Sequence, residues 1–324
     1  MEKSNSISST KVTKTFCIIL CISDNLDHFD AQIASLAQYG ENVFLVISMD
    51  CAKEASKSLA KKIVGCHFMD SDVIFIEGPR QGFLANFMFT SRYALSLKAF
   101  DFYAFCDQDD VWKDTKLSRV ENLLTANSAL PELYCSATNL VDENDTYLGV
   151  HKDKPIETFS MALVENISPG NAMVFNKAAL QLFANTTEYD ILYHDWWIFL
   201  LTIELGQVFF DPMPQVNYRQ HSNNTIGAGA NYKDKVLSAS RRNRYYDSIG
   251  RNLDALIRNE LPLSPKSKYV LSRFRCIFSS NPLRRIYGLY QSGVKRVSLR
   301  DTIFLYLLVL LAPDLSNIKE RYRL

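Results

Sequence analysis

The sequence predicts a mixed α/β protein, with a mostly parallel sheet flanked by helices and a basic helical region at the C-terminal end. Short β-rich apolar runs alternate with amphipathic stretches over the first 210 residues, a pattern typical of parallel α/β sheets. The chain has 324 residues, 47% of them hydrophobic and 22% charged. This is the composition of a globular protein with a large core. The balance of charge also changes along the chain.

That change of charge is hidden in a net charge of +1. From Asn231 onward, 19 Lys and Arg residues face 7 Asp and Glu residues, whereas the preceding 230 residues hold 17 against 28. The asymmetry indicates an acidic catalytic or binding body with a basic appendage that meets something anionic. The 7 cysteines form no C-x-x-C pair, so we expect buried thiols in a reducing compartment rather than a zinc site or a disulfide framework.

The elements of the first half follow from their own patterns. Thr15–Ile22 is a continuous apolar run, as expected of a strand buried on both faces. Helical spacing of apolar residues follows it and stops at Gly40. The same alternation predicts helices at His28–Tyr39, Ala52–Ile63 and Phe83–Leu97 and further strands at Val43–Ser48, Val73–Ile76 and Phe102–Cys106.

The second half is more mixed, and the chain after Asn231 is predicted to be helical. The longest apolar run there, Ile303–Ala312, is shorter than the roughly 20 residues that span a bilayer. The polar start of the chain, Met1–Lys14, has no apolar core of a signal peptide. We therefore expect neither a transmembrane helix nor a signal peptide. The remaining predicted elements are strands Leu133–Ala137, Ala172–Phe175 and Val208–Phe210 and helices Lys177–Ala184 and Asp195–Leu205.

An acidic turn follows the strand Phe102–Cys106 and contains Asp107, Gln108, Asp109 and Asp110. Ligands of open α/β sheets bind at the carboxyl ends of the strands, where this turn lies. Three adjacent carboxylates repel one another unless a cation neutralises them, and oxygen ligands suit Mg²⁺ or Mn²⁺. The alternative is a surface turn that caps the helix expected near Asp114. The position at the end of a strand favours the metal.

The residues of this turn resemble the F-x-D-Q-D-D-x-W…K signature of family 2 glycosyltransferases of the rhamnosyltransferase type. Here the segment runs from Phe105 to Trp112 and is followed by Lys116. The resemblance covers about residues 14–230 and implies the GT-A fold of that family, a nucleotide-binding α/β domain joined to an acceptor domain. Four more segments resemble the family's motifs in the same order: Gly82–Phe87, Ser168–Met173, His194–Trp197, and Tyr218–His221 with Asn224 and Gly227.

Pattern and resemblance together predict a division of the chain. Residues 1–13 would be a disordered polar tail and residues 14–230 the glycosyltransferase domain. Within that domain, residues 14–130 would form the nucleotide-sugar-binding half and residues 131–230 the acceptor half. Residues 231–324 would form the basic helical region.

The resemblance implies a donor site at the acidic turn. Asp107 would contact the nucleoside ribose or the metal shell, and Asp109 would ligate the ion. Mg²⁺ or Mn²⁺ would stabilise the negative charge that builds on the departing nucleoside diphosphate. Asp110 would orient Lys116 or cap the following helix. The other donor-side residues implied are Asp50, Gln108, Asn86 and Arg219, with His221 on a phosphate or the metal.

Asp195 corresponds to the family's catalytic base. An inverting transferase needs one carboxylate to take the proton of the acceptor hydroxyl. The alternative is that an Asp in the first turn of a helix complements the helix dipole. The resemblance implies acceptor contacts from His194, Trp196, Trp197, Gly170 and Asn171, while simple packing remains open for one of the two tryptophans.

The nucleoside side departs from the family pattern. Asp50 is retained, but the turn reads Ser-Met-Asp-Cys-Ala, without the family's first Asp and its Gly. The segment Cys21–Asn25 replaces a T-Y-N, and Arg80 stands where Asn is common. These departures leave the donor's identity open and are compatible with reduced activity.

We therefore expect an inverting, metal-dependent glycosyltransferase that moves L-rhamnose from dTDP-rhamnose to a glycan or lipid-linked acceptor in surface polysaccharide synthesis. One alternative is another hexose, glucose or galactose, from a UDP-sugar. A second is a catalytically silent nucleotide-sugar-binding subunit of a polysaccharide assembly complex. No nucleic-acid-binding module is recognisable, so nucleic acid is not an expected partner.

The basic region has two interpretations. Lys295–Arg300 leads into the apolar run Ile303–Leu311, which is the composition of a segment that docks on an anionic membrane surface. The alternative is a helical cover with a solvated basic face. The first interpretation predicts a cytoplasmic protein held peripherally at the inner face of the cell membrane.

Overall fold

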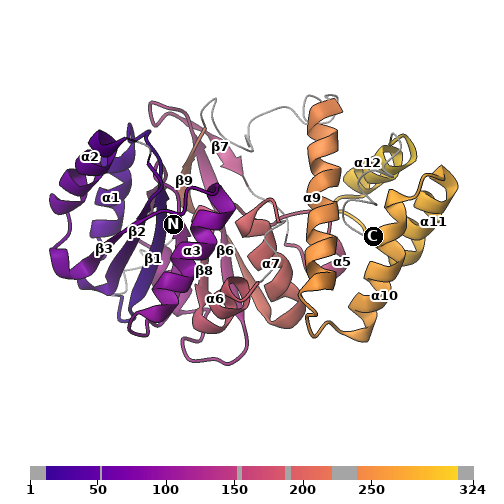
Figure 1. Ribbon diagram of the computed structural model, residues 1–324, viewed down its shortest axis with the longest axis horizontal. Coiled ribbons are helices and arrows are strands. Elements are labelled where there is room, and N and C mark those ends of the chain that lie inside the picture. The colour runs from indigo at the N-terminus through magenta and orange to yellow at the C-terminus, as the bar shows by residue number, and fades with distance from the viewer. Residues whose placement is uncertain (1–11, 52, 152–154, 187–190, 221–238, 313–324) are drawn as a thin grey trace, which may run out of the picture.

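A computed structural model describes residues 12–51, 53–151, 155–186, 191–220 and 239–312. They form a 9-stranded mixed sheet with helices on both faces and a group of C-terminal helices at one end (Figure 1). The predicted α/β class with a mostly parallel sheet is confirmed. The helix α2 and the helix α11 lie at opposite ends of the long axis.

The first four long strands are parallel, in the order β3-β2-β1-β4. Each connection passes through a helix, as the alternating pattern predicts. All four carboxyl ends therefore lie at the same edge of the sheet. The elements are β1 (Phe16–Ile22), α1 (Phe29–Ala37), β2 (Val43–Met49), α2 (Glu54–Gly65), β3 (Val73–Glu77), α3 (Phe83–Ser96) and β4 (Phe102–Cys106), with 3-10 turns at Gly40–Asn42 and Asp70–Asp72.

The second half of the sheet contains the antiparallel pairs. The strand β8 (Met173–Asn176) lies antiparallel between β4 and β6 (Glu132–Val141), and β9 (Gln207–Arg219) runs parallel to β6. The strands β5 (Val111–Trp112) and β7 (Tyr147–His151), which the sequence did not predict, pair with β9 and β6.

The strand β9 is much longer than the predicted Val208–Phe210. Pro212 and Pro214 interrupt its apolar pattern, and the register against β6 shifts between Ser136 and Thr138. A bulge of this kind accommodates prolines, which cannot donate to the ladder. The expectation that Arg219 lies past the last strand is therefore wrong, because it is the last residue of β9.

The strand β1 separates two cores. All seven of its residues are buried, which confirms the prediction from its continuous apolar run. Phe16 and Ile18 pack with α1, α2 and α4 (Lys116–Glu121), while Cys17 and Ile19 face the opposite core. That second core contains α3, α5 (Phe159–Ala162), α6 (Lys177–Ala184), α7 (His194–Leu205) and the C-terminal helices.

The C-terminal region is helical, as predicted, and continues the second core. Side chains of Ser264, Asn281 and Ser298 cap three of its helices. Within the described ranges, no helix combines the length and the apolar character needed to cross a membrane. The helices are α9 (Ala239–Arg258), α10 (Pro265–Phe274), α11 (Pro282–Ser292) and α12 (Leu299–Leu310), with a 3-10 turn at Arg275–Phe278.

Candidate active site

The acidic turn is joined to the neighbouring strand end by Gln108. Its Oε1 accepts hydrogen bonds from the backbone N of Ser23, at 2.6 Å, and from the Ser23 hydroxyl, at 3.2 Å. Its amide nitrogen donates to the carbonyl oxygen of Asn25. Gln108, expected on the donor, therefore positions the loops after β1 and β4 against each other.

Three carboxylates from separate halves of the chain gather at this edge. Asp107 and Asp109 lie in the acidic turn, while Asp195 lies in the first turn of α7. Burial, followed by the charges of Asp109 and Asp195, raises the pKa of Asp107 to about 7. The two predicted metal ligands and the predicted base are therefore close enough for their charges to affect one another.

The donor set at this edge fits Mg²⁺ or Mn²⁺. No three His, Cys, Asp or Glu side chains converge as a metal site among the residues that the structure describes, and His221 lies outside them. Mg²⁺ is commonly held by one or two carboxylates while substrate phosphates complete its shell. Asp107 and Asp109 supply such a pair, and their mutual repulsion is what a divalent cation relieves.

Asp110 points away from this pair and is only 1% exposed. Its Oδ1 accepts from the backbone N of Arg219 at 2.8 Å, and its Oδ2 accepts from the side-chain amide of Asn171. Burial raises the pKa of Asp110 well above its usual range. It does not cap the next helix, since α4 begins at Lys116 with Thr115 as its N-cap residue.

Lys116 and Asp110 are instead connected through Asn171. The buried ammonium of Lys116 donates to the carbonyl oxygen of Asn171 at 2.6 Å and lies 3.3 Å from the centre of the Trp112 ring. Burial lowers the pKa of Lys116 to about 7. Asn171, expected on the acceptor, is 1% exposed and joins the predicted acceptor loop, Ser168–Met173, to the acidic turn.

Arg219 lies behind the acidic turn and is 1% exposed. Its Nε donates to the carbonyl oxygen of Asp109 at 3.1 Å, and its Nη2 lies 2.7 Å from Oδ1 of Asp145. We expected this guanidinium on a donor phosphate. In the structure it supports the backbone of Asp109 and binds the β6–β7 turn.

Asp195 has the surroundings of a general base. Asn166 donates to its Oδ2 at 3.0 Å, and the backbone N of Trp196 donates to its Oδ1 at 2.7 Å. Burial nevertheless raises the pKa of Asp195 to about 6, and these hydrogen bonds together with one from the Gly170 backbone act in the opposite direction. A carboxylate with a pKa near the working pH is suited to taking a proton.

His194 packs beside this carboxylate in an aromatic cluster. Its ring stacks on Phe87 at 4.0 Å between centroids, with 2° between the planes, and is in edge contact with Phe83 and Phe105. Burial lowers the pKa of His194 to about 3, so it is neutral. A Cβ on Gly170 would lie 2.4 Å from its Nε2, so this contact requires glycine.

Both tryptophans of α7 lie in the core. Trp197 is fully buried and its indole donates to Oγ1 of Thr186 at 2.9 Å. Trp196 is 6% exposed and donates to the carbonyl oxygen of Ala162 at 2.7 Å. Packing, which the sequence left open for one of them, describes both in this structure.

Two residues predicted to bind the nucleotide sugar, Asp50 and Asn86, lie after β2 and on α3. Oδ1 of Asp50 accepts from the backbone N of Arg80 at 2.8 Å, where Arg80 has a φ of 55°. Asn86 is buried, and its Oδ1 accepts from the hydroxyl of Ser48 at 2.5 Å. Asn86 therefore fixes α3 to β2, while Asp50 shapes the turn after β3.

Three residues near the site were not singled out from the sequence. Asn166 holds Asp195, and nothing in its own segment indicated this. Gly78 is required because a Cβ there would lie 2.4 Å from Oδ1 of Asp50. Burial and four carboxylates, those of Asp110, Asp107, Asp195 and Asp109, raise the pKa of Tyr218. Its place at the start of the Tyr218–His221 segment was the available signal for Tyr218.

The comparisons that return matches include a rhamnosyl transferase and a mannosyltransferase. No protein-family model matches the chain. A dTDP-rhamnosyl transferase, RfbG of Shigella flexneri, is 27% identical over 161 residues, which are 47% of this chain and 54% of RfbG. The chain thus spans about half the length of this curated relative.

Two solved structures share the fold. The mannosyltransferase PcManGT of Pyrobaculum calidifontis, in complex with GDP-Man and Mn²⁺, has a TM-score of 0.53 at 14% identity, over 96% of this chain and 82% of its own. S. aureus TarS 1–349, in complex with UDP-GlcNAc, has a TM-score of 0.50 at 10% identity, over 95% of this chain and 91% of its own. The fold of this chain is therefore one that glycosyltransferases use.

Proposed function

We propose that this chain is an inverting, metal-dependent glycosyltransferase of the GT-A type and of family 2. The observation that supports the proposal most strongly is that Asp107 lies close enough to both Asp109 and Asp195 for their charges to raise its pKa. A carboxylate of α7 therefore lies near a pair of carboxylates at the end of β4. A reaction that needs one base and one cation site would use such an arrangement.

In this proposal the donor is a nucleotide sugar at the edge formed by β1, β2 and β4. Asp107 and Asp109 would hold Mg²⁺ or Mn²⁺, which supplies charge stabilisation for the leaving diphosphate. Tyr218, surrounded by the acidic groups, would donate a hydrogen bond from its neutral phenol. Asp50 would contact the nucleoside. PcManGT and TarS share the fold of this chain and were solved with nucleotide sugars bound.

Asp195 would act as the base. The acceptor hydroxyl gives its proton to the carboxylate as its oxygen bonds to the anomeric carbon, and the bond from that carbon to the diphosphate oxygen breaks on the opposite face. Asn166 and the backbone N of Trp196 keep the carboxylate oriented. Gly170 has no side chain that would clash with the neighbouring ring of His194.

We propose L-rhamnose from dTDP-rhamnose as the transferred sugar, on a glycan or lipid-linked acceptor. The similarity to RfbG supports this choice. Glucose or galactose from a UDP-sugar is the second candidate, because the altered turn around Met49, Asp50 and Cys51 leaves the donor's identity open. The silent nucleotide-sugar-binding subunit is disfavoured because the three carboxylates are retained together.

A transfer assay with Asp195→Asn tests the proposal. The variant should lose about 10²–10⁴-fold in transfer rate, which is the range that a general base contributes, while donor binding stays close to wild type. Asp30→Asn, on an exposed carboxylate that contacts His67, is the matched control and should keep full activity. Transfer by Asp195→Asn at near wild-type rate would show that Asp195 is not the base.

A further inference from the structure

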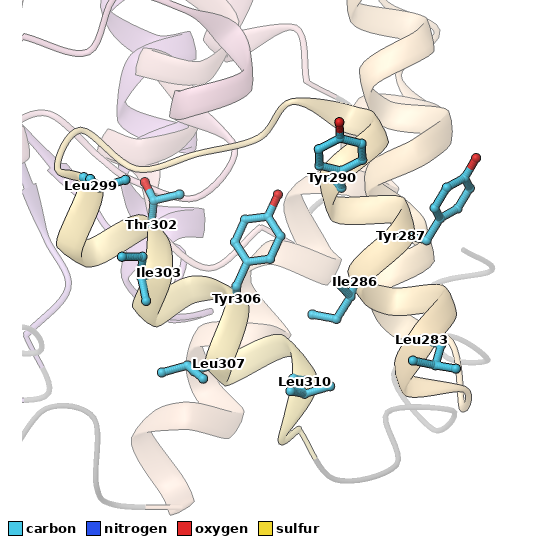
Figure 2. Close-up of a pocket in the computed structure, with 10 residues that line it drawn as sticks. All are labelled: Leu283, Ile286, Tyr287, Tyr290, Leu299, Thr302, Ile303, Tyr306, Leu307 and Leu310. Atoms are coloured by element: carbon cyan, nitrogen blue, oxygen red, sulfur yellow. The ribbon is translucent and has the colours of Figure 1, made fainter.

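An apolar groove lies between α11 and α12, at the end of the molecule opposite the nucleoside side. Figure 2 shows its lining side chains on the two helices. The groove has a volume of about 730 Å³, and all of its lining residues except Thr302 are Leu, Ile or Tyr. Leu283 and Leu299 are each 77% exposed, and Ile303 is 55% exposed. Contiguous exposed apolar surface of this kind marks an interaction site.

The groove lies in the most basic part of the chain. Residues 261–300 contain nine Lys and Arg residues and no Asp or Glu, and the next acidic residue is Asp301. Three exposed cations belong to these two helices and their connection: Arg284 on α11, Lys295 in the connection and Arg300 on α12. Arg285 and Arg296 are used internally, on Ser279 and Glu165, so the other three cations of α11, α12 and their connection are the ones exposed beside the groove.

A second hollow of about 480 Å³ adjoins the groove and shares Leu299 and Thr302 with it. Its lining includes Lys295 and one carboxylate, Glu157. The apolar groove is thus followed directly by a more polar recess with a cation at its edge. The apolar groove would thus face the acyl chains of a bilayer, and the recess with Lys295 would face its headgroups.

We propose that the α11–α12 groove and its exposed cations form a docking surface for an anionic lipid bilayer. Helices of 11 and 12 residues can lie in the interface with an apolar face about 5–10 Å below the headgroups. Arg and Lys side chains reach back to the phosphates. The inference rests on the proposed function in one respect: docking here brings the site to a lipid-linked acceptor.

Other occupants fit the surface less well. A second copy of the chain would bring two sets of like charges together across the groove, which costs affinity. A nucleic acid would pair with the cations but would leave the Leu and Ile side chains without an apolar partner. An anionic bilayer complements both features at once.

Co-sedimentation with lipid vesicles tests the proposal. The full chain should sediment with vesicles of phosphatidylcholine and phosphatidylglycerol, more weakly with phosphatidylcholine alone, and less as salt is raised. Neutralising the three cations in Arg284→Gln/Lys295→Gln/Arg300→Gln should weaken binding on the order of a hundredfold. The matched triple control, Lys61→Gln/Lys62→Gln/Lys98→Gln, removes exposed lysines elsewhere and should change little.

A second pair of variants tests the apolar side chains of the α11–α12 groove. Ile303→Ser/Leu307→Ser should weaken binding at least tenfold, whereas Leu59→Ser/Met69→Ser, which removes equally exposed apolar groups on α2 and in the turn that follows it, should not. Equal binding by wild type and both groove variants would overturn the proposal. So would a dimer that Ile303→Ser/Leu307→Ser dissociates, or vesicle binding that appears only after residues 313–324 are removed, since these results would name another occupant.

Nucleotide titration of the same proteins separates this inference from the proposed function. Groove variants that lose vesicle binding and keep metal-dependent nucleotide binding support both. Vesicle binding without nucleotide binding in the wild type would overturn the glycosyltransferase proposal alone. Nucleotide binding in a wild type that ignores every vesicle would overturn the docking proposal alone.

Discussion

Asp195 illustrates how a single side chain is prepared for chemistry. It accepts two hydrogen bonds that favour its charged form, from Asn166 and from the backbone N of Trp196. Burial outweighs them and raises its pKa to about 6. A carboxylate held in this way is ionised at neutral pH and still basic enough to take a proton. In the folded state its charged form is disfavoured, so the residue makes the protein less stable where it is ionised.

This cost predicts a pH-dependent gain in stability for Asp195→Asn. At pH below about 3 the carboxyl is protonated in folded and unfolded chains, so variant and wild type should be equally stable. As pH rises from about 4 to about 6, the wild type loses up to about 3 kcal/mol, because its folded pKa lies above its unfolded one. Urea unfolding at both ends of this range measures the difference. A gain of equal size at both pH values would contradict the electrostatic explanation.

At the scale of elements, the acceptor loop and α7 depend on close approach at Gly170. This residue lies in the 3-10 turn Gly170–Ala172, directly before β8, and it faces the ring of His194. The next residue, Asn171, joins Asp110 to Lys116. The turn Gly170–Ala172 therefore fixes the distance between the acidic turn and Asp195 on α7.

Gly170→Ala should consequently reduce transfer by more than about tenfold and lower stability by about 1–3 kcal/mol, because overpacking moves the loop or the helix. Gly65→Ala is the matched control. Its added Cβ meets nothing within 4 Å at the end of α2, so stability should rise by up to about 1 kcal/mol with activity unchanged. Circular dichroism melting and a transfer assay measure both. Full activity in Gly170→Ala would show that the loop tolerates the displacement.

At the scale of the whole molecule, the C-terminal helices are joined to the sheet domain by partly buried polar contacts as well as by the shared core. Arg296 pairs with Glu165 at 2.7 Å, and the backbone N of Val297 donates to the same carboxylate. Ser267 donates to Glu204 on α7 at 2.6 Å. Because Glu165 follows α5 closely, the position of the α11–α12 groove is fixed relative to the acceptor half.

Glu165→Ala should therefore destabilise the protein by about 2–3 kcal/mol, since it leaves Arg296 and the backbone N of Val297 without their acceptor. Asp30→Ala removes an exposed partner of His67 and should cost less than about 1 kcal/mol. Urea unfolding of the two variants provides the comparison. Equal losses would mean that the Glu165 contacts contribute no more than a surface pair.

The sequence predicted the parallel half of the sheet well because each strand there is a continuous apolar run between helical patterns. It missed β5 and β7, which are short or exposed, and it shortened β9 because two prolines interrupt the pattern. At the site, motif order located the acidic turn and Asp195. The burial of Arg219, Trp197 and Asn171 depends on packing between distant segments, which no local pattern expresses.

Calorimetric titration of dTDP and UDP, each with and without Mn²⁺, tests the central claim most directly. Wild type should bind one of the two nucleotides only with the metal, and Asp109→Ala should lose that binding, while Asp30→Ala retains it. The nucleotide that binds would also identify the class of donor. Binding that is independent of Mn²⁺, or unchanged in Asp109→Ala, would contradict the proposal that the acidic turn holds the metal and the donor.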